Sequence, residues 1–158
     1  MSTLRQTADQ IISASIQAVL PDEAVRRALK DFRPEGRVFL VAAGKAAWQM
    51  AHAAVSALGS VEDGVVVTKY DHVKGDIPGV RCYEAGHPVP DANSFAATEK
   101  ALKLVHGLHP EDIVLFLLSG GGSALFEKPL ISGEELQNIT GQLLASGADT
   151  VSYTHLRA

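Results

Sequence analysis

An apolar run that ends in three consecutive glycines constrains the fold of this chain more than any other feature. Ile113–Leu118 contains only apolar residues, and Ser119-Gly120-Gly121-Gly122-Ser123 follows directly. A short apolar run with β-branched residues predicts a strand that is buried on both faces in the middle of an α/β sheet. Glycines at the carboxyl end of such a strand allow positive φ and let backbone N–H groups approach an anion. The alternative is a flexible turn.

Strand patterns alternate with helix patterns along the chain. This alternation predicts a doubly wound α/β domain of Rossmann-like appearance, a three-layer sandwich whose mainly parallel sheet has helices on both faces. We expect the first two helices to cover the sheet. The other predicted strands are Val38–Ala43, Gly64–Thr68 and Val80–Ala85, and the predicted helices are Thr3–Leu20, Asp22–Phe32, Gly44–Leu58, Asn93–His106 and a last one between the capping box at Ser132 and Gly147.

Composition and charge exclude several classes of protein. The 158 residues suit one domain, and a net charge of −4 gives no basic footprint for nucleic acid or an anionic membrane. The amino terminus lacks the order of a signal peptide, and no apolar run approaches the length of a membrane span. A single cysteine, Cys82, rules out an internal disulfide framework and fits a reducing compartment. We therefore predict a cytoplasmic protein.

Polar residues follow several predicted strands. Gly44-Lys45, residues 68–72 and Ser119–Ser123 all lie where a strand ends. Because the carboxyl ends of parallel strands share one edge of the sheet, a lysine, a glycine turn and a few carboxylates could meet there. Lys45 suits phosphoryl oxygens, since its charge offsets charge that develops during transfer, but it could equally be a solvated residue of a first helical turn. The surrounding AAGKAA is not a Walker motif.

A loop stiffened by two prolines holds two further candidates. His87 lies between Gly86 and Pro88, where it either braces the loop or acts as a base or ligand. Asp91 is either a turn or N-cap residue, or a carboxylate that holds substrate or Mg²⁺ through water.

The remaining polar residues carry weaker signals. Asn93 or Ser94 is expected to cap the following helix, and Lys69, Asp71 and His72 are expected to form a solvated loop. No metal-ligand motif is evident, because the histidines are scattered. Ser119 and Ser123 lack the GxSxG order of a serine hydrolase.

Five segments of the chain form a recognisable set: VFLVAAGKAAWQMA, GVVVTKYDH, YEAGHPVPDANS, LFLLSGGGSALFEKP and EELQNITGQLLASGAD. Together they resemble the N-terminal domain of the class II glycerate 2-kinases, a family that pairs this domain with a C-terminal domain often called MOFRL. The resemblance runs from Thr3 to Asp149, and five motifs in the same order are more specific than any one of them.

The resemblance implies phosphorylation of D-glycerate to 2-phosphoglycerate by ATP with Mg²⁺, and it is compatible with a homodimer. By the same resemblance Lys45 matches the family's active-site lysine. Ser119, Gly120, Gly121, Gly122 and Ser123 match its glycine-rich loop near phosphate or substrate, and Gly44 belongs to the lysine motif. His87, Pro88 and Asp91 match the family's GHPxPD signature.

The last nine residues depart from the family. Where family members continue into a segment resembling INTVRKHLS, this chain reads TVSYTHLRA, so we do not equate Arg157 with the family arginine. We interpret residues 1–149 as the N-terminal domain, 150–158 as an anomalous tail, and the C-terminal domain as missing, which predicts that this piece is inactive alone.

Two other functions remain open from the sequence. Some members of the family have been labelled hydroxypyruvate reductase, an NAD(P)H-dependent activity, although no GxGxxG follows a strand here with an acidic residue about twenty positions on. The second is a non-catalytic fragment that binds ligand and associates through an exposed apolar surface.

Overall fold

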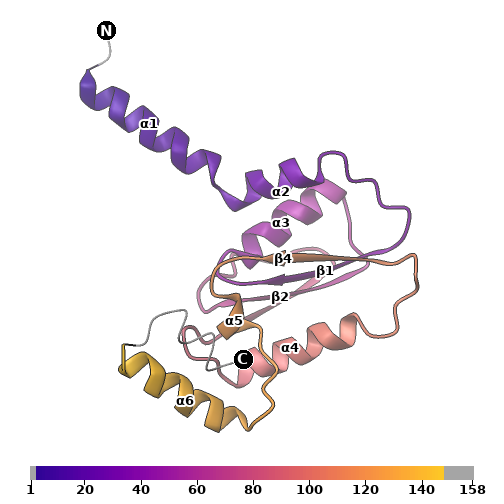
Figure 1. The fold of residues 1–158 in the computed structure, drawn as a ribbon. Helices are drawn as coiled ribbons and strands as arrows, with labels where there is room; N and C mark the ends of the chain where they lie inside the picture. The colour runs from indigo at the N-terminus through magenta and orange to yellow at the C-terminus, as the bar shows by residue number, and fades with distance from the viewer. Residues whose placement is uncertain (1–2, 148–158) are drawn as a thin grey trace.

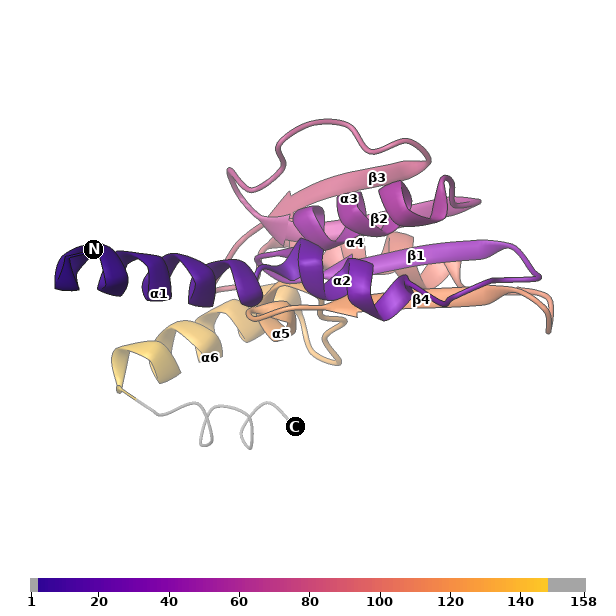
Figure 2. The same cartoon turned by 90° about the horizontal axis from the view of Figure 1, so that it is seen from above.

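The computed structural model describes residues 3–147 and is built around a four-stranded parallel sheet in the order β3-β2-β1-β4 (Figures 1 and 2). The strands are β1 (Val38–Ala43), β2 (Asp63–Lys69), β3 (Val80–Ala85) and β4 (Ile113–Leu118). Ala43, the last residue of β1, pairs with Val67 on one side and with Leu118 on the other. The predicted α/β fold with a parallel sheet between helices is confirmed.

Six helices accompany the sheet in the described residues. Most lie close to the predicted ranges, and the Ser132–Glu135 capping box opens the last one as expected. Pro21 was expected to end the first helix, and it also begins the second, at a position where its missing N–H costs nothing. The helices are α1 (Leu4–Ala18), α2 (Pro21–Leu29), α3 (Ala47–Leu58), α4 (Ala92–Leu104), α5 (Gly122–Leu125) and α6 (Gly133–Ala145).

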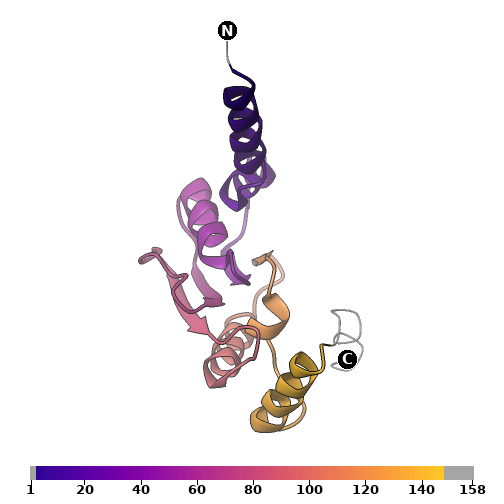
Figure 3. The same cartoon turned by 90° about the vertical axis from the view of Figure 1, so that its left-hand side faces the viewer.

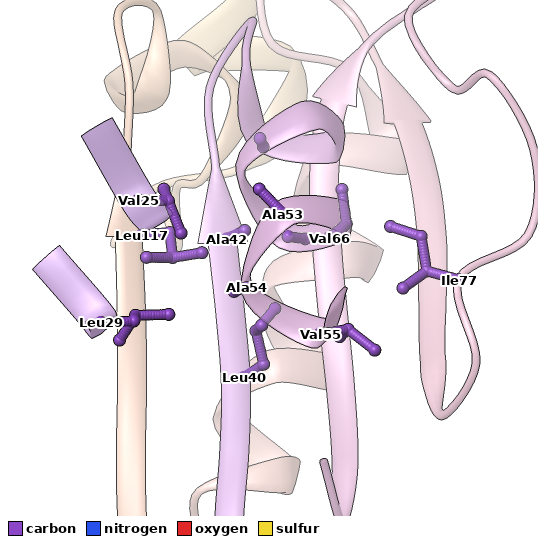
Figure 4. Close-up of a cluster of buried hydrophobic side chains, with 12 residues drawn as sticks. Val25, Leu29, Leu40, Ala42, Ala53, Ala54, Val55, Val66, Ile77 and Leu117 are labelled. Carbon is purple, nitrogen blue, oxygen red and sulfur yellow. The ribbon is translucent and has the colours of Figure 1, made fainter. Parts of the chain in front are cut away.

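Each face of the sheet has its own hydrophobic core. On one face Leu40, Ala42 and Val66 pack under α2 and α3, where the small side chains of α3 let the helix approach closely (Figure 4). On the other face Val41, Val65 and Val67 pack under α4 and α5. Successive residues of β1 and β2 therefore point into different cores, which explains their unbroken apolar sequences.

The prediction that the first helix covers the sheet is wrong. Helix α1 has no buried residue, and it extends away from the sheet and its other helices (Figures 1 and 3). Its amphipathic pattern is real, but Ile11, Ile12 and Ile16 are all exposed. Periodicity predicts that a helix has an apolar face, and it does not identify the surface that covers that face.

The prediction that Ile113–Leu118 lies in the middle of the sheet is also wrong. Within residues 3–147, β4 pairs with β1 alone and forms an edge of the sheet. Val114, Phe116 and Leu118 are 41%, 49% and 61% exposed, because no described element covers that side of the strand. Val114 and Phe116 line an apolar hollow of about 330 Å³ that continues over α4 to Phe126.

Candidate functional site

Lys45 lies in the turn that joins β1 to α3. Gly44 has a φ of +116° and donates its N–H to the Val67 carbonyl at 3.1 Å, which fixes the turn against β2. The Lys45 side chain is exposed, and α3 begins directly behind it at Ala47. The positive end of that helix dipole therefore lies beside a positive side chain. Such a place favours a bound anion.

The turn at Lys45 and the glycine turn after β4 are joined by several hydrogen bonds. The Lys45 N–H donates to the Gly120 carbonyl at 2.9 Å, and the Ala46 N–H donates to Ser119 Oγ at 3.0 Å. The Ser119 N–H donates in turn to the Ala43 carbonyl at 2.9 Å. A Cβ on Gly44 would lie 2.5 Å from the Ser119 carbonyl oxygen, so this contact requires glycine. The glycine turn is thus held in place, which disfavours the interpretation as a flexible turn.

The glycine turn changes direction at Gly121. Gly121 has a φ of +88° and is the N-cap of the short helix α5, which contains Gly122 and Ser123. Gly122 is buried and Ser123 is exposed. Among the described residues, the N–H groups of Gly120 and Gly121 have no protein acceptor. These two amides are available to a ligand.

His87 lies beside Gly121 and Lys45. A Cβ on Gly121 would lie 2.8 Å from His87 Nε2 and 3.3 Å from Lys45 Cε, so the three residues meet in one place. The His87–Pro88 peptide bond is cis. Burial, followed by the nearby charges of Lys45 and Lys69, lowers the pKa of His87. The imidazole is therefore neutral near pH 7.

Asp91 serves the structure of the loop. It is the N-cap of α4, where its carboxylate accepts the Ser94 N–H at 2.9 Å, and the expectation that Asn93 or Ser94 caps the helix is wrong. The same carboxylate accepts the Tyr70 hydroxyl at 2.7 Å. Burial alone would raise the pKa of Asp91, but hydrogen bonds from Tyr70, Ser94 and the Gly86 N–H outweigh it and lower the pKa. Within residues 3–147, no hydrogen bond or ion pair joins Asp91 to Lys45.

The described residues offer no ready site for a cation. Within residues 3–147, no group of three or more His, Cys, Asp or Glu side chains is placed to hold a metal ion. The carboxylate of Asp91, in the same loop as His87, already accepts hydrogen bonds from Tyr70 and Ser94. We assign no residue of this chain to Mg²⁺.

Sequence reasoning undervalued the segment that follows β2. Lys69 was expected in a solvated loop, but it is the last residue of β2 and is partly buried. The next residue, Tyr70, receives a hydrogen bond from Asn93 at 2.9 Å in addition to its bond with Asp91. The available signal was position: both residues lie where a parallel strand ends.

The larger hollows of the molecule do not coincide with these residues. Two hollows, of about 570 and 1100 Å³, lie around Arg33 and Arg37 at the amino ends of β1 and β4. There Arg37 makes an ion pair with Asp112 at 2.7 Å. Residues 3–147 also contain no helix that is long and apolar enough to cross a membrane. The candidate site is therefore defined by its chemistry rather than by cavity size.

Comparison with known proteins identifies the family. Residues 7–157 match a family described as a domain of unknown function, DUF4147. The chain belongs to this family. The match extends over nearly the whole chain, including Lys45, His87 and the glycine turn.

Several curated relatives are similar to the chain. It is 53% identical over 149 residues to the D-glycerate 2-kinase of Thermotoga maritima and 40% identical over 158 residues to the glycerate 2-kinase of Pyrococcus horikoshii. A relative from Agrobacterium vitis, 40% identical over 149 residues, carries the provisional name hydroxypyruvate reductase; the match covers 91% of this chain and 33% of that protein. The two kinase alignments cover 92% of this chain and 36% of each relative. The chain spans about a third of the length of the curated relatives it matches.

Solved structures agree with these similarities. The crystal structure of glycerate kinase from Thermotoga maritima superimposes with a TM-score of 0.84, covering 92% of this chain and 36% of that one. A Pyrococcus horikoshii protein, 38% identical, superimposes with a TM-score of 0.81, and the match covers 94% of this chain and 37% of that one. The fold of residues 3–147 is therefore that of the corresponding part of these proteins.

Proposed function

We propose that this chain is the N-terminal part of a glycerate 2-kinase, which transfers a phosphoryl group from ATP to the 2-hydroxyl of D-glycerate. The observation that carries the proposal is the meeting of Lys45, His87 and Gly121 at one edge of the sheet, in a chain similar to two glycerate 2-kinases. A cation, a neutral imidazole and free backbone amides suit a reaction whose main requirement is to position and stabilise negative oxygens.

Each of these groups has a distinct task in the proposed reaction. Lys45 offsets negative charge on the transferring or substrate oxygens, and the amides of Gly120 and Gly121 donate hydrogen bonds to the same kind of oxygen. His87, neutral near pH 7, can accept a hydrogen bond or proton from the attacking hydroxyl. Asp91 and Tyr70 position the loop that carries His87. Mg²⁺, when bound, would neutralise part of the phosphate charge, and we give none of the residues named above the role of its ligand.

We expect the active site of this chain alone to be incomplete. Phosphoryl transfer depends on several groups acting together, and the kinase relatives are almost three times as long as the matched region. We infer a cytoplasmic protein, as the single cysteine predicts, and leave a homodimer as one arrangement of the full-length protein.

The second candidate is a hydroxypyruvate reductase, which the provisional name of the Agrobacterium vitis relative favours. The turn after β1 reads Gly44-Lys45-Ala46 rather than the glycine-rich turn that a dinucleotide pyrophosphate requires. Oxidation of NADH or NADPH by hydroxypyruvate would support this function over the kinase.

A coupled assay tests the proposal. ATP, Mg²⁺ and D-glycerate are supplied to this chain and to a version extended to the length of its relatives, and formation of ADP and 2-phosphoglycerate is followed. Activity in the extended protein alone is the expected result. Absence of activity in both, together with hydroxypyruvate reduction in the extended protein, would overturn the kinase function.

A further inference from the structure

Lys69 lies at the same edge of the sheet as Lys45 and His87. Ala43 pairs with Val67 in the parallel register. Lys45 lies two residues after Ala43, and Lys69 lies two residues after Val67. Lys69 itself pairs with Ala85, which precedes His87 by two residues. The register therefore brings the ends of β1, β2 and β3 together around these three side chains.

The alternation of β2 determines which face of the sheet Lys69 occupies. Val65 and Val67 belong to the core under α4 and α5, which also contains Leu125. Side chains two residues apart share a face, so Lys69 continues the line of Val65 and Val67. Helix α5 lies on that face and begins directly after Gly121, the residue that contacts His87 and Lys45. Lys69 thus faces the side of the sheet on which the candidate site lies.

The positive charges at this edge have no counter-ion among the described residues. Within residues 3–147, neither the Lys45 nor the Lys69 ammonium group makes an ion pair or a hydrogen bond. Two carboxylates of the adjoining segments are engaged elsewhere: Asp91 accepts from Tyr70 and Ser94, and Glu84 accepts the N–H groups of His72 and Val73.

The charges of the two lysines act on the His87 imidazole. After burial, the charges of Lys45 and Lys69 are the next causes that lower the pKa of His87, which means that both act on the same ring. A bound oxyanion would compensate both charges at once. Two lysines are therefore a better match to an oxyanion than either lysine alone.

We propose that Lys69 is a second anion-binding residue of this site, and that it holds a single oxyanion, of the phosphoryl or carboxylate class, together with Lys45 and the His87 ring. The inference deepens the proposed kinase function and rests on it for the source of the anion, which is either a phosphate of the nucleotide or an acidic group of the substrate.

The test measures binding of inorganic phosphate to this chain by NMR, with the His87 imidazole signal assigned by its loss in His87→Gln. Phosphate is expected to shift that signal and to raise the pKa of His87, because an anion stabilises the imidazolium. Lys69→Met is expected to raise the pKa of His87 in the free chain and to weaken phosphate binding about fivefold. Lys69→Arg keeps the charge and is expected to retain both properties.

Lys74→Met is the matched control, since Lys74 is an exposed lysine in the loop that follows Lys69 and its removal changes the net charge equally. It should leave phosphate affinity and the pKa of His87 unchanged. Equal losses in Lys74→Met and Lys69→Met would overturn the proposal, and so would an absence of phosphate binding or a Lys69→Met chain that binds as tightly as the wild type.

Competition against phosphate identifies the source of the anion. Displacement of bound phosphate by ATP or by D-glycerate supports the proposal and identifies which of the two supplies the anion that Lys69 binds. Failure of the kinase function has a different signature: phosphate binding would depend on Lys69 as expected, while the protein extended to the length of its relatives would form no 2-phosphoglycerate.

Discussion

Lys45 has an exposed side chain, and the fold of residues 3–147 makes no use of its ammonium group. Replacing it by alanine should therefore change the free energy of unfolding by less than about 1 kcal/mol. In the protein extended to the length of its relatives, the same change should lower kcat for phosphorylation of D-glycerate by about 10²-fold or more, because a charge that offsets the transferring oxygens is lost. Steady-state kinetics and chemical denaturation provide the two measurements.

The control for this substitution is Lys74→Ala, which removes an equally exposed charge from a loop away from the Gly121 contact. Its kcat should equal that of the wild type. A Lys45→Ala enzyme with normal turnover would remove Lys45 from the proposed machinery.

Gly44 contrasts with Lys45, because the fold depends on the backbone conformation of this glycine. Alanine at Gly44 would place Cβ 2.5 Å from the Ser119 carbonyl oxygen and would have to adopt a φ of +116°. Because the contact is with backbone atoms, the turn at Gly44 and the glycine turn could relieve it only by moving their main chains. We expect Gly44→Ala to lower the free energy of unfolding by about 2–4 kcal/mol, measured by urea denaturation.

Gly59 is the matched control, because it also has a positive φ, of +83°, but nothing lies within 4 Å of its added Cβ. Gly59→Ala should cost about 1 kcal/mol, the price of the left-handed backbone alone. Equal losses in the two variants would show that the contact between the two turns adds nothing to backbone strain.

The loop between β3 and α4 is held by Asp91, and its stability should depend on pH. Because the native pKa of Asp91 is lowered, this carboxylate stabilises the fold fully above its unfolded pKa of about 3.9, and the contribution is lost as the pH falls through the lower native value. Tyr70→Phe removes one hydrogen bond to the carboxylate. It should raise the pKa of Asp91 and reduce the free energy of unfolding at pH 7.

Denaturation curves recorded from pH 7 down to about pH 2 measure this effect. The difference between wild type and Tyr70→Phe should shrink at the acid end, where Asp91 is protonated in both. Tyr83→Phe is the control, since the Tyr83 hydroxyl has no hydrogen-bond partner among the described residues. A Tyr70→Phe deficit that stays constant down to the acid end would mean that the bond to Asp91 is not its cause.

At the scale of the whole molecule, local sequence patterns predicted the helices and strands well, but they predicted poorly which elements pack against one another. The apolar runs at Val38–Ala43 and 64–68 identified two buried strands, because packing on both faces requires such sequences. The same argument failed for Ile113–Leu118, because an apolar run shows neither how many strands flank it nor which element covers each face.

The candidate site was predicted in part for a similar reason. The carboxyl ends of parallel strands share an edge, which correctly indicated that Lys45 would lie near the glycine turn. The sequence could not distinguish Asp91 from Asn93 as the helix cap, because both side chains are good N-caps and only the path of the loop decides between them. The interpretation of residues 150–158 as a tail lies outside the described residues.

The exposed face of β4 leads to a prediction about the chain in solution. Val114 and Phe116 of β4 form an apolar surface with Leu102 and Phe126, and the outer backbone groups of this edge strand are unpaired among the described residues. Unpaired, apolar edges promote association. We therefore expect this chain to self-associate with rising concentration through that edge, which sedimentation velocity over the micromolar to millimolar range would detect.

Substitution by lysine at the edge tests which surface is responsible. Phe116→Lys places a charge on a half-exposed residue in the middle of β4 and should return the chain to a monomer, because the charge would have to be desolvated on pairing. Leu130→Lys is the control: this leucine is fully exposed at 103% and lies outside the hollow, so the same charge there should leave the association unchanged. If Phe116→Lys and the wild type associate equally, the surface responsible lies elsewhere, and the exposed isoleucines of α1 are the next apolar face to substitute.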